Sequence, residues 1–285
     1  MDNKLIEQYK DDFLCPDSRE DLHYVTKSGD TAEFVNKFET KFTVMKGFVD
    51  FTGGKGAPKV VDTNKSKKVV EPSPADIYEN YLESKDWKAK LFSSMTWGEK
   101  LTAPAFTKAM KVFLTEHQTG TFLDLPVATG LVSVNAFAEF KDMRFYAVDR
   151  STEALNRAYF KLWGRNITNT ILVQADYNKL PFKAEYFDGV TAFAGVNFIK
   201  NIKEAFREIF RVLKKGRRFT GVCFIKTGKQ LADKAIEMFV TQKNVFQSIP
   251  EKEELQAALT DAGFGEVTLS RFEVDSLMRF SGTKR

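Results

Sequence analysis

The chain has few cysteines and histidines and no long apolar run, and each of these absences excludes a class of protein. It has two cysteines, Cys15 and Cys223, too few for a disulfide framework and typical of a reducing compartment. Its two histidines, His23 and His117, argue against a histidine-rich metal site and against most histidine-driven hydrolysis. No stretch approaches the roughly 18 apolar residues of a membrane-spanning helix. The charged start MDNKLIEQYKDDFL lacks the apolar core of a secretion signal. We therefore expect a cytoplasmic protein with no membrane span and no metal.

The overall composition is that of a globular protein with a sizeable core. Of the 285 residues, 43% are hydrophobic and 28% are charged. The net charge of +5 is spread thinly, whereas nucleic-acid-binding surfaces usually cluster their lysines and arginines. The 27 phenylalanines exceed what is usual, and they predict a packed core that also has rings to line an apolar pocket.

Residues 1–53 differ in pattern from the rest of the chain. Their short alternating segments LHYVT, AEFVNKF and KFTVMKGFVDF predict a small β-rich domain. Residues 54–75 are rich in Gly, Pro and Lys and predict a linker. From residue 76 to residue 285, strands alternate with helices of 10–15 residues, which is typical of a mostly parallel α/β sheet. Two adjacent strands near 266–272 and 276–283 predict an antiparallel edge.

Acidic residues stand at the ends of three successive predicted strands, at Asp124, Asp149 and Asp176. Each one alone also suits a helix N-cap. Ligands of open parallel sheets bind at the carboxyl ends of the strands, where an acid on the second strand accepts hydrogen bonds from ribose hydroxyls. Tyr177 is placed to lie against an adenine ring. The loop PVATG, with Gly130, lets backbone approach a ligand, but it holds fewer glycines than a dinucleotide's pyrophosphate needs.

These segments, taken together, resemble a known family. FLDLPVATGLVS, FYAVDRSTEAL, ILVQADYNKLPF, FDGVTAFAGVNFIKN and EIFRVLKKGRRF look like class I S-adenosylmethionine-dependent methyltransferases, in particular the ubiquinone/menaquinone-biosynthesis type. The resemblance covers residues 76–285. It implies an α/β fold with a Rossmann-like seven-stranded sheet and an antiparallel C-terminal edge. It also implies an enzyme, a methyltransferase, with S-adenosyl-L-methionine as its cofactor.

The resemblance also implies roles for individual residues. Asp124 matches the acid that orients the amino group of the methyl donor, and Asp149 matches the acid that binds its ribose. Asp176 and Tyr177 match the pair that contacts adenine. The expected cofactor-binding residues are Asp124, Pro126, Val127, Ala128, Gly130, Asp149, Arg150, Asp176, Tyr177 and Phe193.

One position departs from the family pattern. Pro126, Ala128 and Gly130 fall on the three usual glycine positions of the loop after the first strand. The methyl group of Ala128 is expected to push the methionine part of the donor outward or to weaken its binding.

The N-terminal segment has its own resemblance. DFLCPDSREDLHYV and FETKFTVMKGFVDF look like the zinc-ribbon-like domain that precedes some methyltransferases, including ribosomal-RNA guanine methyltransferases. A structural zinc needs four Cys or His ligands. Cys15 is present, but Ser18, Val35 and Phe38 occupy the other positions. We expect a ribbon that is held by apolar packing without zinc.

The catalytic candidates are Tyr78 and Tyr81, in the helix expected to cap the donor, and Asn197, in the segment that usually floors the methyl-transfer site. Trp97 and Phe198 are candidates for the walls of an acceptor pocket. The main interpretation is a methyltransferase for a small apolar or aromatic acceptor. One alternative is an RNA methyltransferase that grips RNA with the N-terminal domain. Another is an S-adenosylmethionine-binding protein whose catalysis is lost or repurposed.

Overall fold

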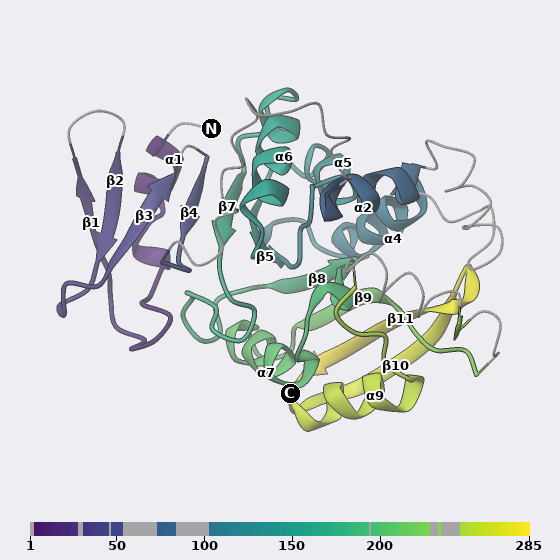
Figure 1. The fold of residues 1–285 in the computed structure, drawn as a ribbon. Coiled ribbons are helices and arrows are strands. Elements are labelled where there is room, and N and C mark those ends of the chain that lie inside the picture. The colour runs from purple at the N-terminus through teal and green to yellow at the C-terminus, as the bar shows by residue number, and fades with distance from the viewer. Residues whose placement is uncertain are drawn as a thin grey trace.

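The computed structural model describes residues 3–27, 31–45, 47–53, 73–83, 103–193, 195–228, 233–234 and 246–285. In these residues one large mixed sheet is flanked by helices (Figure 1). Its strands are β1 (His23–Thr26), β2 (Ala32–Val35), β3 (Lys41–Met45), β4 (Phe48–Asp50), β5 (Gly120–Asp124), β6 (Met143–Asp149), β7 (Thr170–Gln174), β8 (Gly189–Phe193), β9 (Arg218–Phe224), β10 (Phe264–Phe272) and β11 (Val274–Lys284).

The helices precede, connect or follow these strands. They are α1 (Asn3–Gln8), η1 (Lys10–Asp12), α2 (Pro74–Glu83), α4 (Ala103–Thr115), α5 (Ser133–Phe137), α6 (Thr152–Trp163), η2 (Val196–Phe198), α7 (Ile202–Val212) and α9 (Lys252–Asp261). None of the helices in the described ranges is long and apolar enough to cross a membrane.

The sheet runs in the order β1-β2-β3-β4-β7-β6-β5-β8-β9-β11-β10. Strands β7, β6, β5, β8 and β9 are parallel, and β11 pairs antiparallel with both β9 and β10. The mixed α/β fold and the antiparallel C-terminal edge therefore agree with the prediction. The described part of residues 76–285 contributes seven strands, β5 to β11, and β1 to β4 extend the same sheet beyond β7.

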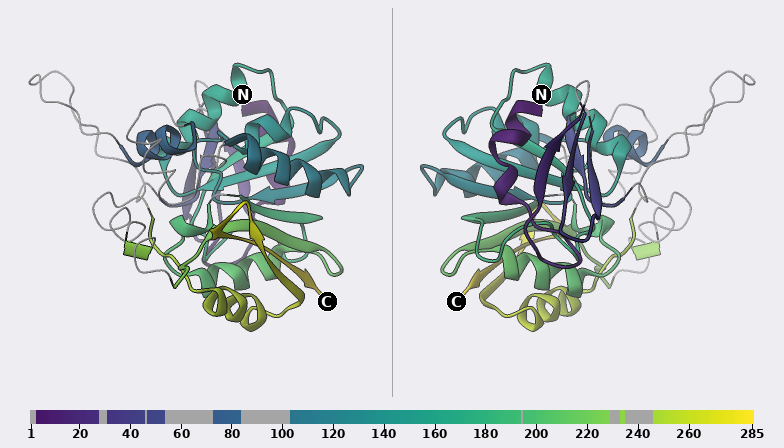
Figure 2. Two further views of the ribbon diagram at one scale, coloured as in Figure 1. Left: turned by 90° about the vertical axis from the view of Figure 1, so that its right-hand side faces the viewer. Right: turned by 90° about the vertical axis from the view of Figure 1, so that its left-hand side faces the viewer.

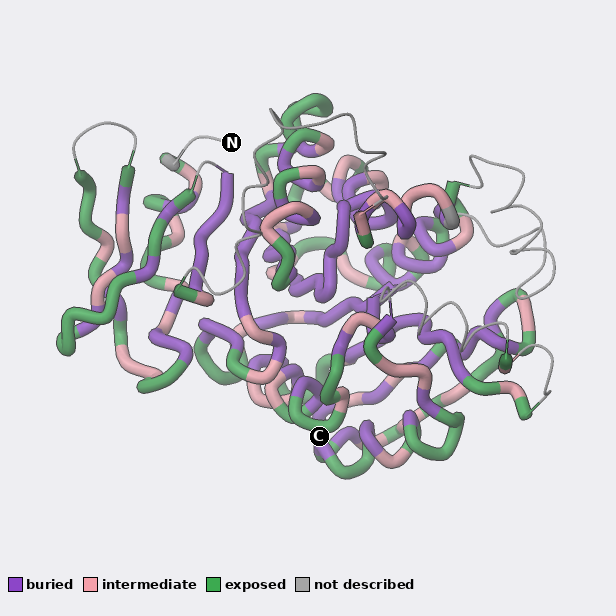
Figure 3. The backbone as a smooth tube through the Cα atoms, in the orientation of Figure 1, coloured by how far each residue is buried: buried purple, intermediate pink, exposed green. Residues whose placement is uncertain are grey.

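Two helical layers bury the central strands on both faces. On one face, Phe122 and Phe145 pack with Phe106 of α4 and Phe137 of α5. The other face lies against α7 and α9, through residues such as Ile209. All five residues of β7 and of β8 are buried, which is why these strands read as continuous apolar runs (Figure 3).

The N-terminal strands belong to the same sheet and the same core. Strand β4 pairs parallel with β7, opposite Leu172 to Gln174. Phe13 is 1% exposed, and its ring lies 5.7 Å from that of Phe182 and 6.0 Å from that of Tyr146. These strands lie beside β7 in Figure 1, and they cover the side of the molecule that faces the viewer in the right-hand view of Figure 2. Residues 1–53 and residues 76–285 therefore share an apolar interior.

The buried side chain of Cys15 contacts the loop that carries Asn36. Asn36 Nδ2 donates a hydrogen bond to Cys15 Sγ at 3.6 Å. Asn36 Oδ1 accepts from the backbone N–H groups of Phe38 at 3.0 Å and Thr40 at 2.8 Å. Among the described residues, no group of three His, Cys, Asp or Glu side chains is placed to hold a metal ion. The asparagine amide thus joins the two loops by hydrogen bonds.

The sequence pattern predicts the start of α6 correctly but places the end of α7 too late. Ser151 caps α6, because its Oγ accepts from the N–H of Ala154 at 3.2 Å. Helix α7 ends at Val212, before the expected Gly216, because Leu213 turns extended and bridges to Phe187. The helix predicted over about 228–240 lies mostly outside the described residues.

Candidate functional site

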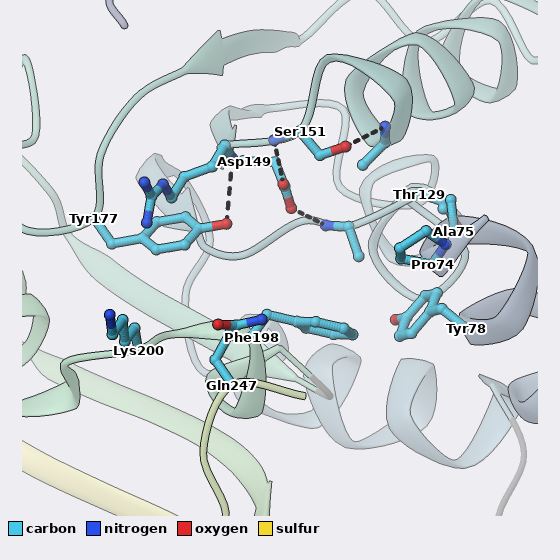
Figure 4. A pocket seen from close by; sticks show the side chains of 13 residues that line it. Pro74, Ala75, Tyr78, Thr129, Asp149, Ser151, Tyr177, Phe198, Lys200 and Gln247 are labelled. Atoms are coloured by element: carbon cyan, nitrogen blue, oxygen red, sulfur yellow. Dashed lines mark hydrogen bonds between the residues drawn. The ribbon is translucent and has the colours of Figure 1, made fainter. Parts of the chain in front are cut away.

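A cavity of about 410 Å³ lies at the carboxyl ends of β6 and β7 (Figure 4), a size typical of small-molecule sites. The loop after β5, the start of α6 and helix α2 surround it together with the segments after β8 and before α9. Its described lining residues are Pro74, Ala75, Tyr78, Ala128, Thr129, Asp149, Arg150, Ser151, Ala154, Tyr177, Phe198, Lys200 and Gln247.

Asp149 is the one acidic side chain in this described lining. It is 6% exposed, and it stands at the end of β6, opposite Gln174. Its Oδ2 accepts from the N–H of Ala128 at 2.8 Å, and its Oδ1 accepts from the N–H of Ser151 at 2.9 Å. Burial raises the pKa of Asp149, and these backbone hydrogen bonds oppose the rise. Each oxygen still has lone-pair capacity for a ligand hydroxyl.

The other two acids of the predicted trio make hydrogen bonds within the protein. Asp124 pairs within the strand ladder with Ala147 and Thr191, two residues short of the sheet edge that Asp149 reaches. Its carboxyl group accepts from Ser133 Oγ at 2.5 Å and from Thr191 Oγ1 at 2.8 Å. Asp176 Oδ1 accepts from the backbone of the turn that follows it. Neither acid is among the described lining residues, although the charge of Asp149 contributes to a raised pKa of Asp124.

The environment of Asp124 also changes its ionisation. The side chain is 2% exposed, and burial raises its pKa to about 7, against the opposing effect of the two hydroxyl hydrogen bonds. Asp124 is thus part of the buried interior next to the site.

The loop after β5 approaches the cavity through its backbone. Ala128 has φ +50°, a left-handed conformation, and it lines the cavity together with Thr129. Gly130 has φ +73°, and a Cβ at this position would lie 2.8 Å from Val134 Cγ2. Pro126, Val127 and Gly130 shape the loop without entering the described lining.

Tyr177 closes the end of the cavity nearest β7. Its hydroxyl accepts from the N–H of Arg150 at 3.2 Å, so the ring spans the ends of β6 and β7. Burial and the Asp149 charge raise the pKa of Tyr177 well above its usual value. Lys200 lies on the same side of the cavity in Figure 4.

The wall opposite Asp149 comes from residues after β8. Phe198 of η2 faces the ring of Tyr78 at 5.5 Å and packs on Phe246 at 5.4 Å. Phe193, at the end of β8, is buried outside the described lining. Phe198 therefore gives the cavity an aromatic wall, while its predicted contact with an acceptor stays a prediction.

Asn197 does not reach the cavity. It is fully buried, and its Nδ2 donates to the carbonyls of Phe224 and Ser248, both at 2.9 Å. Its Oδ1 accepts from the N–H of Phe224 at 2.9 Å. The amide is occupied by backbone groups, so Asn197 joins η2 to β9 and to the segment that carries Gln247.

Helix α2 covers the cavity with Pro74, Ala75 and Tyr78. Burial and the charges of Asp124 and Asp149 raise the pKa of Tyr78, so its phenol stays protonated. Tyr81 belongs to the same helix, but its side chain is not among the described ones. Trp97 lies outside the described residues.

Several lining residues escape sequence reasoning. Ser151 and Ala154 line the cavity because they lie at the N-terminus of α6, and the N-cap signal at Ser151 could have pointed to them. Lys200 and Gln247 have no motif, because they are brought in by packing of segments far apart in the chain.

The cavity fits the adenosyl part of a methyl donor. Asp149 offers acceptor capacity for a ribose diol, and the left-handed turn at Ala128 leaves room for backbone to approach. Tyr177 supplies aromatic surface for a flat ring.

Comparisons with known proteins agree with this geometry. Residues 123–220 match the methyltransferase domain family. The ubiquinone/menaquinone biosynthesis C-methyltransferase UbiE of Pseudomonas putida (strain W619) is 33% identical over 128 residues, which are 38% of this chain and 50% of that protein. UbiE of Pseudomonas aeruginosa (strain LESB58) is 34% identical over 119 residues, 35% of this chain and 46% of that protein. The chain spans about half the length of these relatives.

Solved structures share the fold. A putative S-adenosyl-L-methionine-dependent methyltransferase from Methanococcus maripaludis aligns with TM-score 0.52 at 21% identity, over 77% of this chain and 97% of that one. Phosphoethanolamine N-methyltransferase 2 of Haemonchus contortus, solved with S-adenosylhomocysteine, aligns with TM-score 0.56 at 16% identity, over 73% of this chain and 60% of that one. Residues 123–220 thus match the methyltransferase domain family, and the chain shares its fold with solved S-adenosylmethionine-dependent methyltransferases.

Proposed function

We propose that this chain transfers a methyl group from S-adenosylmethionine to a small apolar or aromatic acceptor. The observation that carries the proposal is the cavity at the end of β6, where Asp149 and the aromatic ring of Phe198 lie on opposite sides. The cofactor supplies a methyl group on a sulfonium, which makes the reaction an in-line substitution. The protein's part is to bind, orient and exclude water.

The lining assigns a task to each side of the cavity. Asp149 accepts hydrogen bonds from the ribose hydroxyls and thereby fixes the position of the methyl donor at the end of β6. Tyr177 packs at the adenine end. Tyr78 has a raised pKa, so it acts as a hydrogen-bond donor to an electronegative ligand atom and not as a base. Phe198 and Tyr78 exclude water from the acceptor side.

The N-terminal strands offer little support for RNA as the acceptor. Lys27 pairs with Glu33 at 2.6 Å, and Lys37 pairs with Glu20. Phosphate binding draws on free lysines and arginines, so neutralised cations weaken that alternative.

The donor assignment is tested by calorimetric titration of the full chain with S-adenosylmethionine and S-adenosylhomocysteine. Asp149→Asn should weaken binding by about 1–3 kcal/mol, because it removes half of the acceptor capacity at a buried site. Asp142→Asn is the matched control, since Asp142 is an exposed acid just before the start of β6, at the end of that strand opposite Asp149. Equal effects of the two substitutions would contradict the assigned role of Asp149.

The acceptor class is tested with S-adenosylmethionine labelled in its methyl group. The chain is incubated separately with a protein-free small-molecule extract and with total RNA from the same cells. We expect label in an extractable small molecule. Label in RNA would support the RNA alternative, and donor binding without transfer to either fraction would indicate lost catalysis.

A further inference from the structure

A network of ion pairs holds helix α2 against α6 beside the cavity. Two acids of α2, Asp76 and Glu79, face two cations of α6, Arg157 and Lys161. Arg157 Nη2 lies 2.7 Å from Asp76 Oδ1, and Arg157 Nη1 lies 3.6 Å from Glu79 Oε2. Lys161 Nζ lies 2.6 Å from Glu79 Oε1. Spacings of three residues on α2 and four on α6 place each pair on one helix face.

Arg157 is at the centre of this network of ion pairs. It also pairs with Glu153 of its own helix at 2.7 Å, and Ser73 Oγ donates to Glu153 at 2.7 Å. The hydrogen bond from Arg157 holds the pKa of Asp76 below its usual value. The Arg157 side chain is 27% exposed, and it is not among the described lining residues of the cavity.

The same helix carries part of the cavity's cover. Pro74, Ala75 and Tyr78 line the cavity, while Asp76 and Glu79 meet α6. A displacement of α2 relative to α6 therefore also shifts Tyr78, whose ring lies 5.5 Å from that of Phe198.

We propose that Arg157 is a positioning residue that holds α2 over the cavity, so that ligand affinity depends on ion pairs that do not touch the ligand. The identity of that ligand rests on the proposed function. If the binding-competent state requires α2 in place, the apparent dissociation constant rises as the fraction of chains with α2 in place falls. Ion pairs at partly exposed positions weaken with salt, so the affinity is regulated by ionic strength.

The test uses the full chain and two readouts. The first is S-adenosylhomocysteine affinity at low and high NaCl. The second is hydrogen exchange of the α2 amides, residues 74–83, without ligand. Arg157→Gln should weaken affinity about tenfold at low salt and remove most of the salt dependence. It should also speed exchange in α2 while the melting temperature stays near the wild-type value.

Three further variants separate positioning from a general loss of stability. Arg157→Lys keeps the charge and should recover part of the affinity. Asp76→Asn should act like Arg157→Gln, and the double variant should show less than the sum of the two effects. Lys111→Gln removes the remote Lys111–Glu139 pair and should change neither readout.

The outcomes are distinct. Wild-type affinity and α2 exchange in Arg157→Gln would overturn the proposal, as would faster exchange throughout the sheet. If the wild-type chain does not bind S-adenosylhomocysteine, the proposed function fails. The exchange readout would then still decide whether Arg157 positions α2.

Discussion

Ala128 adopts a conformation that L-residues adopt at a cost. Its φ is +50°, yet its N–H makes one of the two backbone hydrogen bonds to Asp149. The left-handed region costs a non-glycine residue about 1–2 kcal/mol. One of the hydrogen bonds that hold the Asp149 carboxylate therefore comes from a strained residue.

Replacing Ala128 by glycine tests this strain. Ala128→Gly relieves the left-handed penalty but adds about 0.5–1 kcal/mol of chain entropy in the unfolded state. We expect stability in urea to stay level or rise by up to about 1 kcal/mol. Ala205→Gly, in the middle of α7, is the matched control and should lose about 1 kcal/mol. A similar loss in both variants would show that Ala128 is not strained.

Asp124 predicts a pH dependence of stability. Its pKa is about 7 in the folded chain and near 3.8 when unfolded. Between these values the folded state holds a proton that the unfolded state has lost, so stability falls as pH rises from about 4 to about 7. The cost is about 1.4 kcal/mol for each pKa unit.

Asp124→Asn removes this titration. Urea unfolding between pH 4 and pH 8 should show a shallower decline than in the wild type, with part of the slope left because the pKa of Asp149 is also raised. An unchanged pH profile would mean that Asp124 ionises normally in the folded protein.

At the scale of elements, the short helix η2 is placed by Asn197. Three hydrogen bonds of its amide hold η2 to β9 and to the segment before α9. These contacts set Phe198 and Gln247 on the wall opposite Asp149. A side chain that never meets the ligand therefore decides where two lining residues stand.

Truncating this amide should be costly. Asn197→Ala leaves buried backbone groups of Phe224 and Ser248 unpaired, and we expect a loss of about 3 kcal/mol in urea unfolding. Asn201→Ala removes only the N-cap of α7 and should lose about 1 kcal/mol. Losses of equal size would contradict the structural role given to Asn197.

At the scale of the whole molecule, one sheet joins the N-terminal strands to the methyltransferase strands. Phe13, Phe34 and Phe51 pack together, and the Phe13 ring meets Phe182 and Tyr146. We expect residues 1–53 and 76–285 to unfold together, because separating them would expose this interior and the open edge of β7.

Calorimetry tests this coupling. The wild-type chain should melt in a single transition, and Phe13→Ala should lower the stability of the whole chain by about 3–5 kcal/mol. Phe38→Ala is the control, since Phe38 is 67% exposed and should change stability little. Two separate transitions, with only the first affected by Phe13→Ala, would show that the N-terminal strands fold as a domain of their own.

The sequence by itself determined the order of strands and helices, the parallel centre with its antiparallel edge, and the place of Asp149 at the end of a central strand. These follow from local periodicity and from the rule that parallel strands end at a common edge. Tertiary structure alone decided that Asp124 turns into the packing, that Asn197 is occupied by backbone, and that Lys200 and Gln247 reach the cavity. It also decided that β4 pairs with β7. Each depends on contacts between residues far apart in the chain, for which a local pattern carries no signal.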